Sequence, residues 1–240
     1  MPFTFSHPAI TLPLTYLPKR FYSLTGLIAG SVAPDFEYFI RFRPEGHYSH
    51  TLDGMFWFDL PLALSLAFIF HLFMRDMLIS SLPGWFSRRL NCYSGFDWKN
   101  DFVKRWPVIL ISLLAGIFSH LFWDAFTHGT GWFVTHFLFL QTNFRIAGYD
   151  VPLYHILQHS NSVLGALVIL YAIKKLPENS AGGKFDFRYW GIAVLVALVV
   201  IGVGALLGKD YWVYGELIVT GISGGLIGIF VAGIEKRSRV

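Results

Sequence analysis

Apolar residues gather in five long runs along this chain, and polar segments rich in turn-forming residues separate the runs. Each run has about the 20 residues that a helix needs to cross the hydrocarbon layer of a bilayer. The pattern therefore predicts an all-α, polytopic membrane protein with about five transmembrane helices. The predicted spans are Met55–Met74, Pro107–Phe126, Ile156–Ile173, Trp190–Leu207 and Gly215–Ile234.

A shorter apolar segment, Ser23–Val32, precedes the first span and is too short to cross a membrane. The basic turn Pro18–Arg20 interrupts any extension of this segment. We expect a short re-entrant or interfacial helix here. Pro34 is expected to end this helix, because a proline disfavours helical backbone in the residue before it. Asp35 would then lie at the mouth of the helix.

The last two predicted spans are rich in small residues. Glycines four positions apart, such as Gly224 and Gly228, allow helices to approach closely. We predict a single membrane domain, residues 1–240, in which residues 1–175 carry the candidate site and residues 176–240 form a helical hairpin for packing. The same glycines offer a surface through which two copies can form a homo-oligomer.

The composition agrees with a membrane protein and narrows the alternatives. Charged residues make up 14% of the chain, whereas soluble domains carry about 25%. The net charge of +4 does not indicate nucleic-acid binding, because the basic residues lie in loops beside apolar spans. A single cysteine excludes a disulfide within the chain and a cysteine-based zinc cluster. The N-terminal segment lacks the features of a signal peptide, so we expect it to be retained.

Lysine and arginine are unevenly shared between alternate connecting segments. Residues 75–106, 174–189 and 235–240 together hold thirteen, and the segments predicted on the opposite side hold six. The positive-inside rule places the richer segments in the cytoplasm. The C-terminus is therefore predicted to be cytoplasmic, and residues 1–54 are predicted to lie on the outer side of the membrane.

The most specific polar pattern is the series His120, Asp124 and His128, which begins in the second span and ends just beyond it. Residues four apart lie on one face of a helix. An acid inside a span costs roughly 2.5–3.5 kcal/mol on insertion scales, so Asp124 needs a partner. The histidines can supply hydrogen bonds alone, or Asp124 can bind or bridge metal ions between them. Both interpretations remain open from this pattern.

Further histidines on the predicted outer side favour the metal interpretation. His155 and His159 are four positions apart at the start of the third span, a spacing that lets a helix hold one metal ion. His7, Asp35 and His50 add three more candidate ligand residues in the N-terminal segment. The chain contains no glycine-rich phosphate loop, no nucleophile elbow and no convincing Ser/His/Asp triad.

The N-terminal segment also contains three motifs that resemble a known family. They are Met1-Pro-Phe-Thr-Phe-Ser-His-Pro-Ala9, Gly30-Ser-Val-Ala-Pro-Asp-Phe-Glu-Tyr-Phe39 and Gly46-His-Tyr-Ser-His-Thr51. Nearly the whole chain resembles a family of prokaryotic polytopic membrane proteins, a domain of unknown function. That family is similar in turn to inner-membrane metal-dependent hydrolases and, more distantly, to the zinc-dependent phospholipase C and nuclease superfamily.

The second resemblance implies a set of metal ligands. In the superfamily an early His, an Asp, a His, a His-x-x-x-Asp pair, another His and a His-x-x-x-Glu pair bind a cluster of zinc ions. The matching residues of this chain are His7, Asp35, His50, His120, Asp124, His128 and His155. The pattern departs at its end, where His159 stands in place of the glutamate, so the number of metal ions is left open.

We therefore predict a metal-dependent hydrolase of a prokaryotic inner membrane, with its site at the outer face. Imidazole and carboxylate ligands favour Zn²⁺, with Mn²⁺ or Fe as alternatives. Asp124 is expected to bind or bridge the metal, and Glu37, near Asp35 in the sequence, is the candidate general base. The expected substrate is a phosphoester or lipid-like molecule among the membrane lipids. The alternatives are a protein that translocates protons or metal ions, and a non-enzymatic scaffold with a structural His/Asp cluster.

Overall fold

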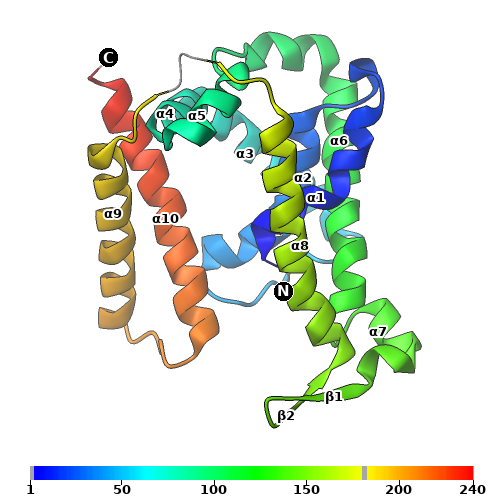
Figure 1. Cartoon of the computed structure of the whole chain (residues 1–240). Coiled ribbons are helices and arrows are strands. Elements are labelled where there is room, and N and C mark those ends of the chain that lie inside the picture. The colour runs from blue at the N-terminus through cyan, green and yellow to red at the C-terminus, as the bar shows by residue number, and fades with distance from the viewer. Residues whose placement is uncertain (1–2, 180–182, 240) are drawn as a thin grey trace. The chain divides into compact units, whose positions relative to one another are not determined.

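The computed structural model describes residues 3–179 and 183–239, and these residues are mostly helical (Figure 1). Five helical stretches are long and apolar enough to cross a membrane. They are Met55–Ser81, Trp98–His136, Leu153–Lys175, Phe187–Leu206 and Tyr214–Arg237. Each overlaps one of the five predicted spans. The predicted fold class is confirmed, and the five apolar helices indicate a multi-pass membrane protein.

Within the described residues the helices are interrupted by one short two-stranded sheet. The α-helices are α1 (Pro8–Thr11), α2 (Leu24–Arg41), α3 (Leu60–Ile69), α4 (Arg75–Ser81), α5 (Gly84–Leu90), α6 (Trp98–Thr127), α7 (Trp132–His136), α8 (Leu153–Lys175), α9 (Phe187–Leu206) and α10 (Tyr214–Arg237). Short 3-10 helices cover Thr4–Ser6, Leu12–Tyr16, Lys19–Phe21, Asn91–Tyr93 and Leu138–Gln141, and π-helical turns cover Met55–Asp59 and Phe70–Met74. Strands β1 (Asn143–Ile146) and β2 (Tyr149–Pro152) pair antiparallel as a hairpin before α8.

Helix α6 is bent near its start. The backbone of Arg105 is not helical (φ −132°, ψ 21°), and Pro107 follows two residues later. Because a proline ring clashes with the carbonyl one turn before it and offers no N–H, kinks are expected at this position. The helix therefore begins at Trp98, before the predicted span, and changes direction where the apolar run begins.

The chain divides into two compact units, each assembled from three separate segments. The first unit contains Met1–Pro34, Tyr48–Ser65 and Arg105–Ala172, and the second contains Asp35–His47, Leu66–Lys104 and Ile173–Val240. The first unit thus includes α1 and most of α2, α6 and α8. The second includes α4, α5, α9 and α10.

Helix α2 lies very close to α6 in the first unit, because glycines occupy the contact. A Cβ atom placed on Gly116 would lie 2.5 Å from the carbonyl oxygen of Leu27 and 2.7 Å from the amide nitrogen of Ser31. A Cβ atom on Gly30 would overlap the main chain of Leu113. Leu27 and Leu113 are almost fully buried beside these glycines. Only residues without a Cβ permit this approach, so the glycines fix the spacing of the two helices.

Pro34 does not end α2, contrary to the expectation from the sequence, because the helix continues to Arg41. A proline inside a helix costs about 3 kcal/mol. Burying one aliphatic side chain contributes about 1.5–3 kcal/mol, and Leu27 and Ala33 are both buried. Tertiary packing therefore offsets the local preference. Asp35 consequently lies inside the helix, and not at its mouth.

In the second unit, α9 and α10 pack side by side along small residues (Figure 1). A Cβ atom on Gly224 would lie only 2.9 Å from Cα of Ala197. The Tyr189 hydroxyl donates a hydrogen bond to the carbonyl of Ile229 across the same contact (3.1 Å). A Cβ atom on Gly225 would meet no described atom within 4 Å. Association of two copies through these glycines stays a prediction.

Candidate metal centre

The carboxylate of Asp124 lies on α6 in the first unit, among four histidine side chains. The Asp124 side chain is only 7% exposed. Its oxygens lie 3.2 Å from Nε2 of His7, 3.4 Å from Nε2 of His50, 3.3 Å from Nε2 of His120 and 3.6 Å from Nδ1 of His128. The fold thus brings together five predicted site residues, although His7 and Asp124 are 117 positions apart in the sequence.

The segment before α1 places His7 at this carboxylate by binding to α8. The Ser6 hydroxyl donates a hydrogen bond to the carbonyl of Ser162 (2.8 Å), and the amide of Phe3 donates to the Ser162 hydroxyl (2.8 Å). The His7 ring is buried and stacks on the ring of His120, with 3.8 Å between the ring centroids. Hydrogen bonds and stacking together therefore restrain His7 from both sides.

His50 reaches the site from a loop with a strained backbone. Its φ of 61° lies in the left-handed region, which costs a residue with a Cβ roughly 1–2 kcal/mol. Its Nδ1 lies 3.0 Å from the hydroxyl of Ser49, which holds the ring. Strain of this kind persists only where the surroundings impose it, and it clusters at functional sites.

The contacts of His120 define which ring nitrogen carries the proton. Nδ1 lies 2.7 Å from the carbonyl oxygen of Ser31, and because a carbonyl only accepts, Nδ1 is the donor. In the neutral ring Nε2 is then an acceptor. It points at Nε2 of His50 and at Oδ2 of Asp124, each 3.3 Å away. Nε2 of His120 therefore presents its lone pair to these two atoms, and either a proton on Nε2 of His50 or a metal ion between the three atoms satisfies the arrangement.

His7 repeats this arrangement on the other oxygen of the carboxylate. Its Nδ1 lies 3.2 Å from the carbonyl oxygen of Thr4, so Nδ1 donates there. Its Nε2 faces Oδ1 of Asp124 at 3.2 Å. Two arrangements satisfy this contact. Either Nε2 also carries a proton, which makes the ring a cation, or a metal ion lies between Nε2 and the carboxylate.

Three of these atoms form a nearly equilateral triangle. Its sides are 3.3 Å between Nε2 of His50 and Nε2 of His120, 3.3 Å from His120 to Oδ2 of Asp124, and 3.4 Å from His50 to the same oxygen. Zinc binds nitrogen and oxygen at about 2.0–2.1 Å, so neighbouring ligand atoms of a tetrahedral site lie about 3.3–3.4 Å apart. The donor set and its dimensions therefore fit Zn²⁺.

His128 differs from the other three histidines. Its Nδ1 is the nitrogen that faces the Asp124 carboxylate, at 3.6 Å, and it lies 3.1 Å from the main-chain carbonyl of Asp124, so this nitrogen donates a hydrogen bond and offers no lone pair to a metal. The side chain of His128 is 29% exposed. The geometry places His128 at the rim of the site, next to the helix end.

The two predicted acids of α2 have different surroundings. Asp35 is fully buried. It stands one turn after Ser31 on the same helix, and residues four apart share a helix face. Glu37 is also buried, but its Oε1 accepts a hydrogen bond from the amide of His47 (2.7 Å) and lies 3.8 Å from the Arg41 guanidinium. Glu37 thus supports the loop after α2, and its role as a general base stays a prediction.

The predicted pair His155 and His159 lies on α8, and both residues are exposed. Neither belongs to the group of metal-ligand atoms that lie together in the described part of the chain. The ring of His155 instead packs on the ring of Tyr154, with 4.7 Å between centroids. Metal binding by this pair stays a prediction.

Two groups that organise the site carry no signal in the sequence. The carbonyls of Ser31 and Thr4 select the protonated nitrogen of His120 and His7. Every residue has such a carbonyl, so no residue type identifies them. Metal-binding histidines commonly donate their other nitrogen to a carbonyl in this way, which strengthens the metal interpretation.

A family model described as a domain of unknown function (DUF4184) matches residues 1–234. The predicted resemblance to a family of unknown function is thereby confirmed, although Met1 and Pro2 of its first motif lie outside the described residues. No curated protein and no solved structure matches the chain. The similarity to metal-dependent hydrolases therefore has no support from named relatives.

Proposed function

We propose that this chain, which belongs to the DUF4184 family of domains of unknown function, is a metal-dependent membrane hydrolase. The family carries no stated activity, so the proposal rests on the chemistry of the first unit. The observation that carries it is the triangle of His50, His120 and Asp124, with sides of 3.3, 3.3 and 3.4 Å between atoms of the kinds that bind metal ions.

In this proposal His50, His120 and Asp124 bind one metal ion. Metal binding by Asp35, which the sequence also predicts, stays a prediction. Imidazole with carboxylate suits zinc, whereas a larger share of oxygen ligands would favour manganese or iron. Zinc is therefore the proposed ion.

A bound zinc ion supplies a Lewis acid and lowers the pKa of a bound water to about 7, so that a nucleophile is available at neutral pH. The chain's residues hold and orient this site. Asp124 binds with Oδ2, and its Oδ1 lies 3.2 Å from Nε2 of His7. The contact with His7 restrains the orientation of the carboxylate.

The exposure of the histidines indicates where substrate enters. His7 and His120 are buried, whereas the side chains of His50 and His128 are 22% and 29% exposed. Substrate would therefore approach from the side of His50 and His128. Because the site lies within a helix apolar enough to cross a membrane, we propose a phosphoester with a lipid-like body. The predicted orientation places this side at the outer face.

One observation favours a second function, translocation of protons or a metal ion. Asp59 is a second fully buried acid within an apolar helical stretch of the first unit. Carriers of ions need such residues in series through the membrane. A non-enzymatic scaffold with a structural metal would use the same ligands without either activity.

The test is elemental analysis of the detergent-purified protein, with the double variant His120→Ala/Asp124→Ala beside the wild type. Asp150→Asn, an exposed residue of the β-hairpin, is the matched control. We expect about one zinc per chain in the wild type and the control, and none in the double variant. The loaded protein is then assayed for phosphoester hydrolysis and, in proteoliposomes, for zinc uptake.

The outcomes separate the candidate functions. Zinc-dependent hydrolysis that Asp124→Asn abolishes in a folded protein supports the hydrolase. Zinc binding with uptake but no hydrolysis favours translocation, and binding with neither favours a scaffold. If the wild type takes up no zinc, manganese or iron even after reloading, the metal centre itself is refuted.

A further inference from the structure

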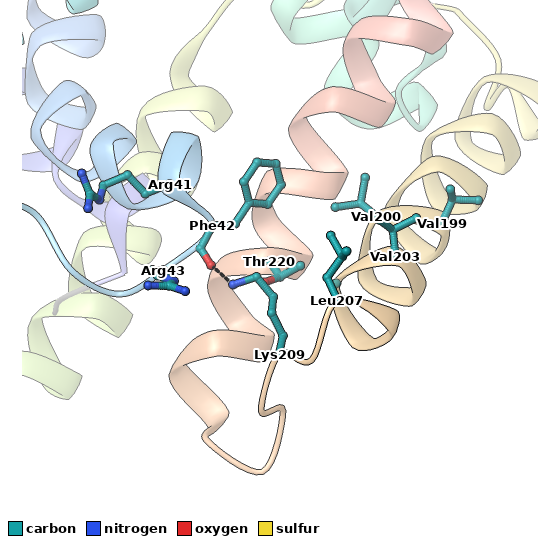
Figure 2. Close-up of a pocket in the computed structure, with 10 residues that line it drawn as sticks. Arg41, Phe42, Arg43, Val199, Val200, Val203, Leu207, Lys209 and Thr220 are labelled. Atoms are coloured by element: carbon teal, nitrogen blue, oxygen red, sulfur yellow. Dashed lines mark hydrogen bonds between the residues drawn. The ribbon is translucent and has the colours of Figure 1, made fainter.

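The second unit contains a pocket that the proposed hydrolase does not use. It has a volume of about 730 Å³ and lies among α9, α10 and the segment that follows α2. Figure 2 shows basic side chains at one end of this pocket and aliphatic side chains of α9 at the other. The volume lies in the range of about 300–1,000 Å³ that is usual for ligand sites.

The basic end is formed by Arg41, Arg43 and Lys209. The Lys209 ammonium donates a hydrogen bond to the carbonyl of Phe42 and pairs with Glu216 (2.7 Å), so its position is fixed and its charge is matched. The guanidinium of Arg41 lies 3.8 Å from the carboxylate of Glu37. Arg43 is exposed and makes no ion pair with any described residue. The pocket therefore has an unmatched positive charge at Arg43.

The opposite wall is aliphatic and open. Val199, Val203 and Leu207 line it and are 55%, 48% and 81% exposed. From Val199 to Leu207 the wall extends about 12 Å, at 1.5 Å per residue of helix. An apolar wall of this length is costly in water, but it is compatible with the hydrocarbon of a bilayer.

The two ends lie at different depths along a helix that is apolar enough to span a membrane. That stretch, Phe187–Leu206, ends at Leu206, and Lys209 follows three residues later. Lys209 and its basic neighbours are thus expected at the level of the lipid phosphates, and Val199 at the level of the acyl chains. The pocket matches a molecule with an anionic head and an apolar tail.

We propose that this pocket binds one anionic phospholipid, with its phosphate at Arg43 and Arg41 and an acyl chain along Val199, Val203 and Leu207. A small soluble anion would leave the aliphatic wall uncovered. An uncharged lipid would leave the Arg43 charge unmatched. A single lysine or arginine at the membrane surface attracts an anionic headgroup by about 1 kcal/mol. This inference concerns the second unit only and does not depend on a metal.

The test uses the full-length protein in nanodiscs of phosphatidylcholine with a minor fraction of phosphatidylglycerol, and native mass spectrometry of the lipids that remain bound. We expect one phosphatidylglycerol per chain to be retained in preference to phosphatidylcholine. Arg43→Gln should lower this preference about fivefold, which corresponds to about 1 kcal/mol for one surface cation. Arg188→Gln, an exposed arginine at the other end of α9, is the matched control.

A second variant tests the apolar wall. Val203→Trp fills the pocket and should abolish retention, whereas Leu195→Trp, at an exposed position of α9 outside the pocket, should not. Unchanged thermal unfolding verifies the fold of each variant. Because no described residue pairs with the Arg43 side chain, Arg43→Gln is expected to fold, and its lipid preference tests the proposal even if Val203→Trp does not fold.

Equal preference for the two lipids in the wild type, or equal retention by Arg43→Gln and the wild type, would overturn the proposal. In a further experiment, inorganic phosphate is added as a competitor for the bound lipid. If it displaces the lipid completely and Val203→Trp has no effect, the pocket is a soluble-anion site and the lipid proposal is refuted. Retention in the presence of phosphate supports it.

Discussion

His120 donates the hydrogen of its Nδ1 to the main-chain carbonyl of Ser31, 2.7 Å away, across the contact between α6 and α2. This bond turns Nε2 toward His50 and Asp124. The position of the carbonyl depends on how closely the two helices approach, and glycines set that approach. The orientation of a proposed metal ligand is therefore coupled to the packing of two backbones.

Gly116→Ala should weaken both the fold and the metal site. Its Cβ would lie 2.7 Å from the amide nitrogen of Ser31, so the helices must separate. We expect a loss of about 1–3 kcal/mol of stability from overpacking and about 10–100-fold weaker zinc binding, as for other losses of an orienting partner. Thermal unfolding in detergent and zinc titration measure the two effects. Gly225→Ala, in open space on α10, should leave zinc affinity unchanged.

Single histidine variants should distinguish metal ligands from orienting residues. His50→Gln and His120→Gln remove atoms of the triangle, so bound zinc should be lost. His128→Gln removes a side chain whose Nδ1 already donates to the Asp124 carbonyl. It should retain one zinc per chain with at most about tenfold weaker affinity. Elemental analysis after dialysis against a chelator measures the zinc that each variant retains. Complete loss of zinc from His128→Gln would show that His128 is a metal ligand.

Asp186 should make the stability of α9 depend on pH. Its carboxylate accepts a hydrogen bond from the amide of Tyr189 (3.0 Å), and this bond, aided by Lys236 at 3.1 Å, lowers the pKa of Asp186 below its usual value. A lowered pKa in the folded state means that the stabilisation is present above the unfolded pKa of about 3.9 and is lost as the pH falls below it.

Asp186→Ala removes this N-cap and should cost about 1 kcal/mol at neutral pH. The difference in unfolding temperature between the wild type and the variant should shrink as the pH is lowered from about 6 to about 3. Asp186→Asn, which keeps a capping side chain, should lie between the two at neutral pH. A constant difference over the whole range would show that the charge of Asp186 contributes nothing.

Cys92 provides a native probe of the predicted orientation. It is exposed in the 75–106 segment, which the positive-inside rule places in the cytoplasm. Partial burial of the sulfur raises the pKa of the Cys92 thiol, so a maleimide that cannot cross membranes should be applied above about pH 8, where more thiolate forms. We expect labelling only after the membrane is permeabilised.

The complementary probe is His136→Cys in a Cys92→Ser background. His136 lies in α7, beyond the outer end of the second predicted span, and it should be labelled in intact cells. If Cys92 is labelled in intact cells and His136→Cys only after permeabilisation, the orientation is opposite to the predicted one, and the proposed metal centre faces the cytoplasm. Labelling of both in intact cells would show that the two segments share the outer side.

The amino-acid sequence alone determined the five spans, because the length and hydropathy of a run are local properties that a bilayer selects directly. It also determined the pairing of His120 with Asp124, since a helical repeat puts residues four apart on one face. The prediction that Pro34 ends the helix was wrong, because it rested on a local preference alone. The tendency of proline to interrupt a helix was outweighed by the burial of Leu27 and Ala33 against other parts of the fold.

Tertiary structure alone decided which other groups meet Asp124. His7 comes from 117 positions away, and His50 lies 70 positions from His120. The carbonyl of Ser31, which every residue type could supply, sets the tautomer of His120. Arg43 and Lys209 likewise meet at one pocket only after folding. Such sites depend on the distances between backbone segments that are far apart in the sequence. Glycine contacts and hydrogen bonds between helices set those distances, and no local sequence pattern encodes them.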